Sequence, residues 1–434
     1  MRHLQWLFHW ITFLCLIFCS ENDAISSDSI DSDLSLELVQ LLFRHGDRNP
    51  IDPYPNDPYK NESFWPEGFG QLTSRGKMQH YRLGQYLRKR YDGFISRDYN
   101  PYEIAVQSSD VDRALMSAST NLAGLYPPVD NFSTWNQNLT WQPIPIHSLA
   151  SQLDNKLRLN ESCPRYDELR SQFRASDIMH QVNEENKDLY EYLTNHSGRS
   201  IHDPQQVDYL YDVLYIENLY HRKVPDWASK ILTSVQMQNL TAFSFKMITF
   251  TTEMKRLKGG PLIKELIEHM SERISGKLDK RRKLFMYSAH DTTVATLLNS
   301  LDLYDMIPPP YASLVLVELL KNTTSNQYFV RIGYKNTTQD PFILTLPGCP
   351  QLCLFDDFVK LTKPIIPDDW NAECRKAGFV QYLGGSYIGL LIGGILTMML
   401  VLAVPVMVCI RHRRNAQEPP RYPYLHLQMD DEEA

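Results

Sequence analysis

A mostly apolar run, Leu38–Phe43, leads directly into Arg44-His45-Gly46-Asp47-Arg48, and this junction constrains the chain more than any other feature. The run predicts a buried strand, and the five residues after it hold two guanidinium groups and one imidazole. Arginine keeps its charge and matches phosphate oxygens with paired N–H groups. We therefore expect a sheet that receives a phosphate group at the end of this strand.

Two later strand-to-helix junctions carry related side chains. Glu103–Gln107 predicts a second strand, after which Asp110 is expected to cap a helix with Arg113 in its first turn. A third predicted strand ends just before His290 and Asp291. Ligands bind beyond the carboxyl ends of strands in an open α/β sheet, where helix N-termini offer free amide groups to anions. Residues far apart in the sequence can therefore share one pocket.

His45 is the candidate nucleophile toward a phosphate monoester. An attacking imidazole nitrogen must be unprotonated, and neighbouring arginine charges favour the neutral ring. Attack on phosphorus forms a phosphohistidine, which divides hydrolysis into two steps. Four side chains are expected to bind the phosphate oxygens: Arg44, Arg48, Arg113 and His290.

Asp291 is the candidate proton donor to the leaving oxygen as the P–O bond breaks. A bound phosphate raises the pKa of a neighbouring carboxyl group, which makes donation possible. Once ionised, the same carboxylate can activate the water that cleaves the phosphohistidine.

Simpler interpretations remain open for the site residues. Arg44 and Arg48 are also compatible with surface salt bridges, and His290-Asp291 with a helix cap beside a structural histidine.

The two ends of the chain predict a type I membrane protein. Residues 1–20 have a basic start and an apolar middle, typical of a secretory signal peptide, with an uncleaved anchor as the alternative. Residues 21–33 are rich in serine and aspartate and predict a flexible start. Residues 387–410 carry no charge and are long enough to cross a bilayer, and the basic residues that follow predict a cytoplasmic tail over 411–434. One lumenal domain is expected over 34–383.

The predicted lumenal part has features of secreted proteins. Its four cysteines predict two disulfides with three possible pairings. The closeness of Cys349 and Cys353 favours a bridge between them, which leaves Cys163 for Cys374. Zinc binding is the rival interpretation, but no histidine lies at ligand spacing. Eight Asn-X-Ser/Thr sequons predict glycosylation; they begin at Asn61, Asn131, Asn138, Asn160, Asn195, Asn239, Asn322 and Asn336.

Two motifs resemble those of the histidine acid phosphatases, which form branch 2 of the histidine phosphatase superfamily. They are Arg-His-Gly-Asp-Arg-Asn-Pro at 44–50 and Ser-Ala-His-Asp-Thr-Thr at 288–293. Further segments are similar to the lysosomal and prostatic acid phosphatase subfamily, namely Trp65–Thr73, Ser109–Arg113, Trp141–Pro145 and Pro309–Ser313. The resemblance implies an acid phosphatase.

The resemblance also implies a fold and a set of roles. The fold is α/β, with a phosphoglycerate-mutase-like central mixed sheet flanked by helices and a smaller helical domain inserted at about 160–269. His45 is the implied nucleophile and Asp291 the implied proton donor, with the four phosphate ligands as above and no cofactor or metal. The implied disulfides are Cys163–Cys374 and Cys349–Cys353, and the implied homodimer has Trp141 and His147 at its contact.

The predicted tail resembles that of sorted membrane proteins. Two overlapping segments fit the pattern Tyr-X-X-bulky apolar, one with Tyr422 and Leu425 and the other with Tyr424 and Leu427. We expect clathrin adaptors as partners and a lysosomal or endosomal membrane location, with transit through the cell surface as an open alternative.

The sequence also bears on other functions. The net charge of -7 argues against nucleic-acid binding. An inositol-polyphosphate phosphatase or a lysophospholipid phosphatase would use the same site, with a lysine-rich pocket rim favouring the former and an apolar groove the latter. A membrane receptor or adhesion glycoprotein on a phosphatase fold would require a damaged catalytic set, and all six positions are intact.

Overall fold

The computed structural model of the chain describes residues 33–130, 133–336, 338–375, 393–399, 401–411 and 413. The chain divides into two compact units, Met1–Cys374 and Arg375–Ala434. Several predicted features lie outside the described residues: the signal peptide at 1–20, nearly all of 21–33, the sequon at Asn131 and the tail residues Tyr422, Tyr424, Leu425 and Leu427.

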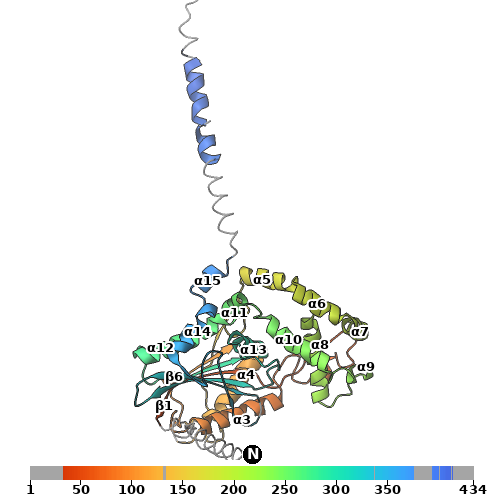
Figure 1. Cartoon of the computed structure of the whole chain (residues 1–434), viewed down its shortest axis with the longest axis vertical. Coiled ribbons are helices and arrows are strands. Elements are labelled where there is room, and N and C mark those ends of the chain that lie inside the picture. The colour runs from red at the N-terminus through yellow and green to blue at the C-terminus, as the bar shows by residue number, and fades with distance from the viewer. Residues whose placement is uncertain are drawn as a thin grey trace, which may run out of the picture. The chain divides into compact units, whose positions relative to one another are not determined.

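The described part of the first unit is built on an eight-stranded mixed sheet (Figure 1), in the order β3-β2-β4-β1-β5-β6-β7, with β8 paired to β6. β1 pairs in parallel with β4 on one side and antiparallel with β5 on the other. The strands are β1 (Leu34–Arg44), β2 (Ile104–Ser109), β3 (His147–Leu149), β4 (Leu284–Ala289), β5 (Leu314–Asn322), β6 (Tyr328–Lys335), β7 (Phe342–Leu344) and β8 (Leu352–Leu354). The expected central mixed sheet is confirmed.

Strand β1 is buried on both faces, as its apolar run predicts. Leu38 and Leu42 join one core cluster, while Val39, Leu41 and Phe43 join the cluster on the opposite face. The alternation follows the two-residue period of a strand. Gln40, the single polar residue of the run, is also buried. Its side-chain amide donates a hydrogen bond to the backbone carbonyl of Leu266.

Helices cover both faces of the sheet, one pair on each face, and α14 (Phe355–Thr362) packs on the same face as the second pair. The first pair packs so closely that a Cβ on Gly84 would lie 2.0 Å from the Asn121 carbonyl oxygen. Only glycine therefore permits this helix crossing. The first pair is α3 (Ser74–Arg90) and α4 (Asp112–Leu125), and the second pair is α12 (Gly260–Ser275) and α13 (Asp291–Ser300).

A run of helices between β3 and β4 forms the helical insert, seen in yellow and green in Figure 1. It has its own core, made mainly by α7, α8 and α10. The predicted insert at about 160–269 also takes in much of α12, which packs on the sheet instead. The helices are α5 (Pro164–Arg174), α6 (Asp177–Glu185), α7 (Lys187–Ser197), α8 (Pro204–Leu219), α9 (Asp226–Ser229), α10 (Val235–Met247) and α11 (Thr252–Lys258).

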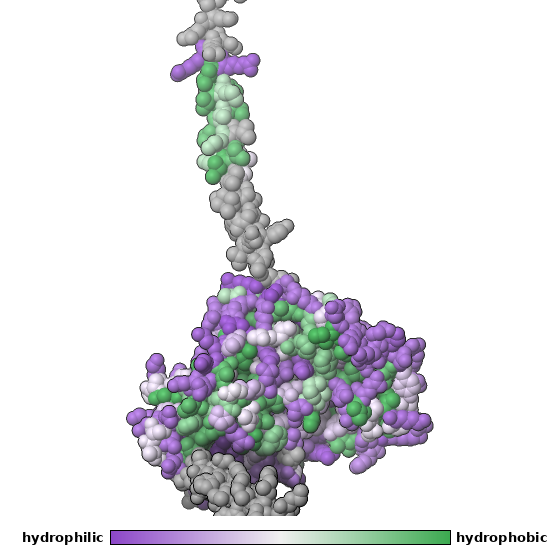
Figure 2. Space-filling view, viewed as in Figure 1, coloured by the Kyte–Doolittle hydropathy of each residue, from purple (hydrophilic) through white to green (hydrophobic). Residues whose placement is uncertain are grey.

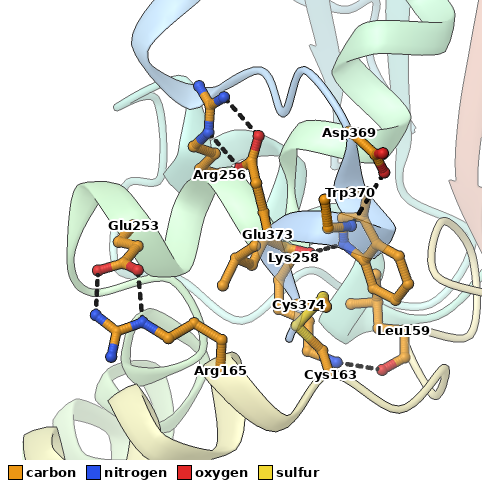
Figure 3. Close-up of a disulfide and its surroundings, with 12 residues drawn as sticks. Leu159, Cys163, Arg165, Glu253, Arg256, Lys258, Asp369, Trp370, Glu373 and Cys374 are labelled. Atoms are coloured by element: carbon orange, nitrogen blue, oxygen red, sulfur yellow. Dashed lines mark hydrogen bonds and ion pairs between the residues drawn. A yellow bond between two sulfur atoms is a disulfide. The ribbon is translucent and has the colours of Figure 1, made fainter. Parts of the chain in front are cut away.

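A disulfide between Cys163 and Cys374 ties the end of the first unit to the start of the insert (Figure 3). Around it, Arg165 pairs with Glu253 through two hydrogen bonds, at 2.7 and 3.0 Å. The indole of Trp370, in the short helix α15 (Trp370–Glu373), donates to a carbonyl of α11 at 2.8 Å. The other expected bridge, Cys349–Cys353, is also formed.

In the second unit, the helix Gly393–Arg411 is long and apolar enough to cross a bilayer, with a mean hydropathy of 2.5. It overlaps the predicted span at 387–410. Figure 2 shows hydrophobic side chains along it.

We expect removal of the long-range disulfide to destabilise the first unit more than removal of the short one. The double variant Cys163→Ser/Cys374→Ser frees a loop of 211 positions. Its free energy of unfolding should fall by about 2–5 kcal/mol, because the unfolded chain regains the entropy that the bridge removed. The matched control is Cys349→Ser/Cys353→Ser, which frees a separation of only 4 positions. Chemical denaturation measures both, and an equal loss would contradict the argument.

Candidate active site

Strand register brings the three predicted junctions to one edge of the sheet. Arg44, the last residue of β1, is in register with Ala289 at the end of β4, and Ser108 of β2 is in register with Ser288. The residues that follow these strands therefore converge, and a cavity of about 890 Å³ opens there. All six predicted site residues line it: Arg44, His45, Arg48, Arg113, His290 and Asp291.

The His45 ring is buried and held by hydrogen bonds at both nitrogens. Nδ1 lies 2.8 Å from the carbonyl oxygen of Gly46, and a carbonyl only accepts, so Nδ1 carries the proton. Nε2 accepts a hydrogen bond from Nε of Arg113 at 3.0 Å. Burial lowers the pKa of His45 well below its ordinary value, and the charges of Arg113 and Arg44 lower it further. The ring is therefore neutral, with its lone pair on Nε2.

The backbone around His45 is fixed by its neighbours. The amide of His45 donates to the Ala289 carbonyl of β4 at 2.9 Å. The amide of Gly46 donates to the hydroxyl of Ser117, on α4, at 3.1 Å. A Cβ on Gly46 would lie 2.5 Å from the Gly76 carbonyl oxygen, so the loop and α3 touch where only glycine fits. The nucleophile candidate thus sits on a rigid support.

Asp47, the acidic residue of the first motif, organises the loop. Its side chain is fully buried and accepts a hydrogen bond from the Thr73 hydroxyl at 2.5 Å and another from the hydroxyl of Tyr220. Thr73 in turn caps α3 by accepting from the Gly76 amide. One carboxylate thereby joins the motif to α3 and to the end of α8, within the insert.

Arg44 and Arg48 each have a carboxylate partner inside the cavity. Arg44 pairs with Asp291 at 2.8 Å, and its guanidinium stacks 4.1 Å from the ring centre of Tyr311. Arg48 makes two hydrogen bonds to Asp212 of α8, at 2.9 and 3.0 Å. The two arginines are only 8% and 5% exposed. The alternative interpretation of both as surface salt bridges is therefore wrong.

The helix that carries Arg113 has a different N-cap residue from the one predicted. Arg113 lies in the first turn of α4, as predicted, but the N-cap residue is Val111 rather than Asp110. The hydroxyl of Ser148, on β3, instead donates to Asp110 at 3.5 Å. Burial and then the charge of Arg48 lower the pKa of Arg113 to about 10, because three cationic side chains crowd one small volume.

His290 and Asp291 begin helix α13. His290 is the N-cap residue, and its Nε2 lies 2.8 Å from the Ser109 hydroxyl at the end of β2. Burial, followed by the charge of Arg113, lowers the pKa of His290 well below its ordinary value. Burial alone raises the pKa of Asp291, but the charges of Arg44 and Arg48 outweigh it, so the net shift is downward. His290 and Asp291 therefore both begin a helix, as the simpler interpretation predicts, and line the cavity.

Other cavity residues were not identified from the sequence, and three of them interact with the predicted site residues: Asp208, Asp212 and Tyr311. Asp208 and Asp212 lie four positions apart on α8, a spacing that also suits an ordinary solvated helix face. Burial, then the charges of Asp291 and Asp212, raises the pKa of Asp208 well above its usual value. Tyr311 lies in the segment Pro309–Ser313, whose only signal in the sequence is its resemblance to the subfamily.

The remaining predicted residues lie away from the cavity, with one exception. Trp141 and His147 are exposed near the sheet edge formed by β3. The sequon at Asn239 begins on α10 and lines the cavity. Five sequon asparagines are exposed and two are partly exposed: Asn61, Asn138, Asn160, Asn195 and Asn239, then Asn322 and Asn336. Within the described residues, no group of acidic, histidine and cysteine side chains is arranged to hold a metal ion.

The sequence profile of the histidine phosphatase superfamily (branch 2) matches residues 35–335. The chain belongs to this family. Prostatic acid phosphatase from Bos taurus is 44% identical over 78% of this chain and 87% of its own length. Lysosomal acid phosphatase from Homo sapiens is 37% identical over 90% of this chain and 91% of its own length. The family consists of hydrolases, and a phosphohistidine mechanism is characteristic of it.

A solved structure shares the fold at low sequence identity. The phytase of Hafnia alvei in complex with tartrate superposes with a TM-score of 0.60 at 16% identity, over 80% of this chain and 99% of that chain. The predicted fold class and the resemblance to histidine acid phosphatases are both confirmed.

We expect Arg113→Gln to move the acidic limb of the pH profile of kcat/KM toward higher pH. The charge of Arg113 lowers the pKa of His45, so its loss raises that pKa. His45 is then protonated at a higher pH, and the rate falls earlier as the solution is acidified.

The matched control for this shift is Arg199→Gln. Arg199 lines the same cavity but is paired with Asp52 at 2.8 Å, and it is not among the main charges acting on His45. If both variants kept the wild-type acidic limb, the charge of Arg113 would not control the protonation of His45.

Proposed function

We propose that the chain hydrolyses phosphate monoesters by moving the phosphoryl group onto Nε2 of His45, with Asp291 donating a proton to the leaving oxygen. The observation that carries this proposal is the pair of hydrogen bonds on the His45 ring, which leave the lone pair on Nε2. The proposed phosphate ligands are Arg44, Arg48, Arg113 and His290. All of them line the same cavity as His45.

In the first step, Nε2 of His45 forms a bond to phosphorus while the bond between phosphorus and the leaving oxygen breaks. The proton of Asp291 passes to that oxygen, so the alcohol leaves neutral. The ring now carries phosphorus on one nitrogen and a proton on the other. The Gly46 carbonyl, which accepts from Nδ1, supports the positive charge that develops on the ring.

In the second step, water attacks phosphorus and the N–P bond breaks. The Asp291 carboxylate takes the proton of that water, which returns both catalytic groups to their starting states. Inorganic phosphate is the product. The arginine charges stabilise the phosphoryl oxygens in both steps, because the same group is transferred twice.

Substrate binding prepares Asp291 for proton donation. In the free site, Arg44 lies 2.8 Å from Asp291, and its charge contributes most to lowering the pKa of the carboxyl against the effect of burial. A bound phosphate takes up the arginine charges and adds its own negative charge, so the pKa of Asp291 rises. A donor of this kind is protonated most readily in acid.

We expect Asp291→Asn to slow the hydrolysis of an alkyl phosphate by roughly 10²–10⁴-fold, because the alkoxide must be protonated as it leaves. The loss should be much smaller with para-nitrophenyl phosphate, whose phenolate leaves readily without a proton. Steady-state kcat/KM on the two substrates measures the difference. A loss of the same size on both would contradict the role of proton donor.

Two further variants complete this test. Asp212→Asn removes another cavity carboxylate, the partner of Arg48, and should lower both rates by one common factor. His45→Ala should abolish both activities and the phosphorylated protein. Rapid alkaline quenching with labelled substrate detects that base-stable adduct, and an adduct that persisted in His45→Ala would exclude this nucleophile.

We propose a lysosomal or endosomal membrane location, with the phosphatase unit in the lumen. The apolar helix Gly393–Arg411 and the similarity to lysosomal acid phosphatase support this location. We further propose that the tail, 411–434, carries its sorting signals at Tyr422 and Tyr424 and binds clathrin adaptors there. Glycans on the sequon asparagines fit the same topology.

We expect the full-length chain to partition into detergent and a chain ending at Arg375 to remain in the aqueous phase. The truncation removes the apolar helix and keeps the disulfide partner Cys374. Its kcat/KM on phenyl phosphate should equal that of the full chain, since every cavity residue lies before it. Detergent-phase partitioning with an activity assay tests this, and a water-soluble full-length chain would contradict the anchor.

We also propose a homodimer that uses the outer edge of the sheet. The edge strand β3 begins at His147 and is exposed along its whole length. Trp135 and Trp141 are 56% and 40% exposed nearby in the sequence, and large exposed aromatic side chains are typical of interaction surfaces.

A second candidate activity is the hydrolysis of phosphate esters with an apolar leaving group, such as lysophospholipid phosphates. Among the described residues that line the cavity there is no lysine, whereas Tyr211, Tyr215, Phe245 and Ile307 contribute aromatic and aliphatic surface. This composition favours an apolar leaving group over an inositol polyphosphate.

A further inference from the structure

Five arginines line the active-site cavity, and Arg158 stands apart from the others. Arg44, Arg48 and Arg199 are each paired with a carboxylate, and Arg113 donates to His45. Among the described residues, Arg158 has neither a hydrogen bond nor an ion pair. A partly buried cation facing a cavity without a protein partner is suited to an anion from outside.

The backbone on both sides of Arg158 is held firmly. The buried carboxylate of Asp154 accepts from the Leu157 amide at 2.7 Å, and Leu157 is fully buried in the core. The Leu157 carbonyl accepts from the Thr293 hydroxyl at 2.6 Å, which ties this segment to the helix that begins with Asp291. On the other side, Lys258 donates to the Leu159 carbonyl at 2.8 Å, as Figure 3 shows. Only the Arg158 side chain is left free to meet a ligand.

The charge of Arg158 acts on one side of the site. It lowers the pKa of Arg113, after burial and Arg48, and that of His290, after burial and Arg113. It is not among the main charges that lower the pKa of His45. Arg158 thus lines the same cavity as His45 without being among the main charges on it, which fits a contact with the leaving group rather than with the transferred phosphate.

Helix α8 brings negative charge to the same cavity through Asp208 and Asp212, and neither carboxylate is paired with Arg158. Burial, then the charges of Asp291 and Asp212, raises the pKa of Asp208. Among the described residues that line the cavity, Arg158 is the arginine without a protein partner, so a leaving group with one added anionic substituent can pair with it. A polyanion would also have to face the carboxylates of α8.

We propose that Arg158 is a specificity-determining residue that binds a second anionic group, carried by the leaving group of the substrate. The preferred substrates are then phosphate monoesters whose leaving group combines apolar surface with one carboxylate or one second phosphate near the ester bond. This inference rests on the proposed function, since it assumes that the ester is hydrolysed at His45.

The test compares substrates that differ only in one charge. Phenyl phosphate carries no second anion. The ortho, meta and para carboxyphenyl phosphates add a carboxylate, and the matching carbamoylphenyl phosphates have the same size without the charge. At about pH 5.5 the benzoate group is ionised. Wild-type protein should prefer at least one carboxyphenyl isomer to its carbamoyl counterpart by about tenfold in kcat/KM, the worth of one hydrogen bond to a charged group.

Arg158→Gln should abolish this preference while changing kcat/KM on phenyl phosphate less than threefold. Arg158→Lys should restore part of the preference, because it returns the charge without the guanidinium fork. Arg199→Gln, which removes a cavity arginine already paired with Asp52, should leave the preference unchanged. An aryl bisphosphate, tested in the same way, shows whether a phosphate serves as well as a carboxylate.

Two outcomes would overturn the inference. An equal loss on all substrates in Arg158→Gln would mean that Arg158 binds the transferred phosphate instead. An absent preference in the wild type, or one that survives in Arg158→Gln, would mean that Arg158 binds no second anion. Failure of the proposed function is seen separately, because wild-type protein would then form no phosphohistidine with phenyl phosphate.

Discussion

The burial of arginine charge around one histidine is the constraint on which the rest of this structure depends. Removing a guanidinium from water is costly unless a carboxylate or a carbonyl oxygen replaces the lost solvation. Asp291 does this for Arg44 and Asp212 does it for Arg48. Burial, together with the concentrated positive charge, lowers the pKa of His45, and the same charge gives an incoming phosphate a preorganised site.

This charge compensation explains why the helical insert belongs to the active site rather than to the periphery. The sheet and its helices supply the arginines and the histidines, but Asp212 comes from α8 of the insert. The same helix end reaches Asp47 through the hydroxyl of Tyr220. An insert with its own core thus completes a site whose proposed nucleophile, His45, directly follows strand β1 of the sheet.

The sequence predicted what is local and missed what only tertiary packing creates. Arg44, His45 and Arg48 lie within five positions, and His290 with Asp291 directly follows a strand, so parallel pairing alone brings these groups together. Asp212 and Arg158 offer no such signal, because a carboxylate on an amphipathic helix and an arginine in a loop are ordinary on a solvated surface. Asp47 is the opposite case. It lies inside the first motif, which suggests a role in catalysis, but its carboxylate holds the loop in place. The predicted N-cap residue, Asp110, is one position before the observed one, Val111, and helix ends are commonly misplaced by one or two residues.

The bridge between Cys163 and Cys374 has a mechanical consequence. Cys374 is the final residue of the first unit, so a force pulling on the chain beyond it meets a covalent bond before it reaches any strand. The force passes through the disulfide to Cys163 at the start of α5, and the Arg165–Glu253 ion pair joins α5 to α11. A pull on the chain at this point is therefore carried into the insert by a covalent bond, and the strands that lead to His45 are spared that stress.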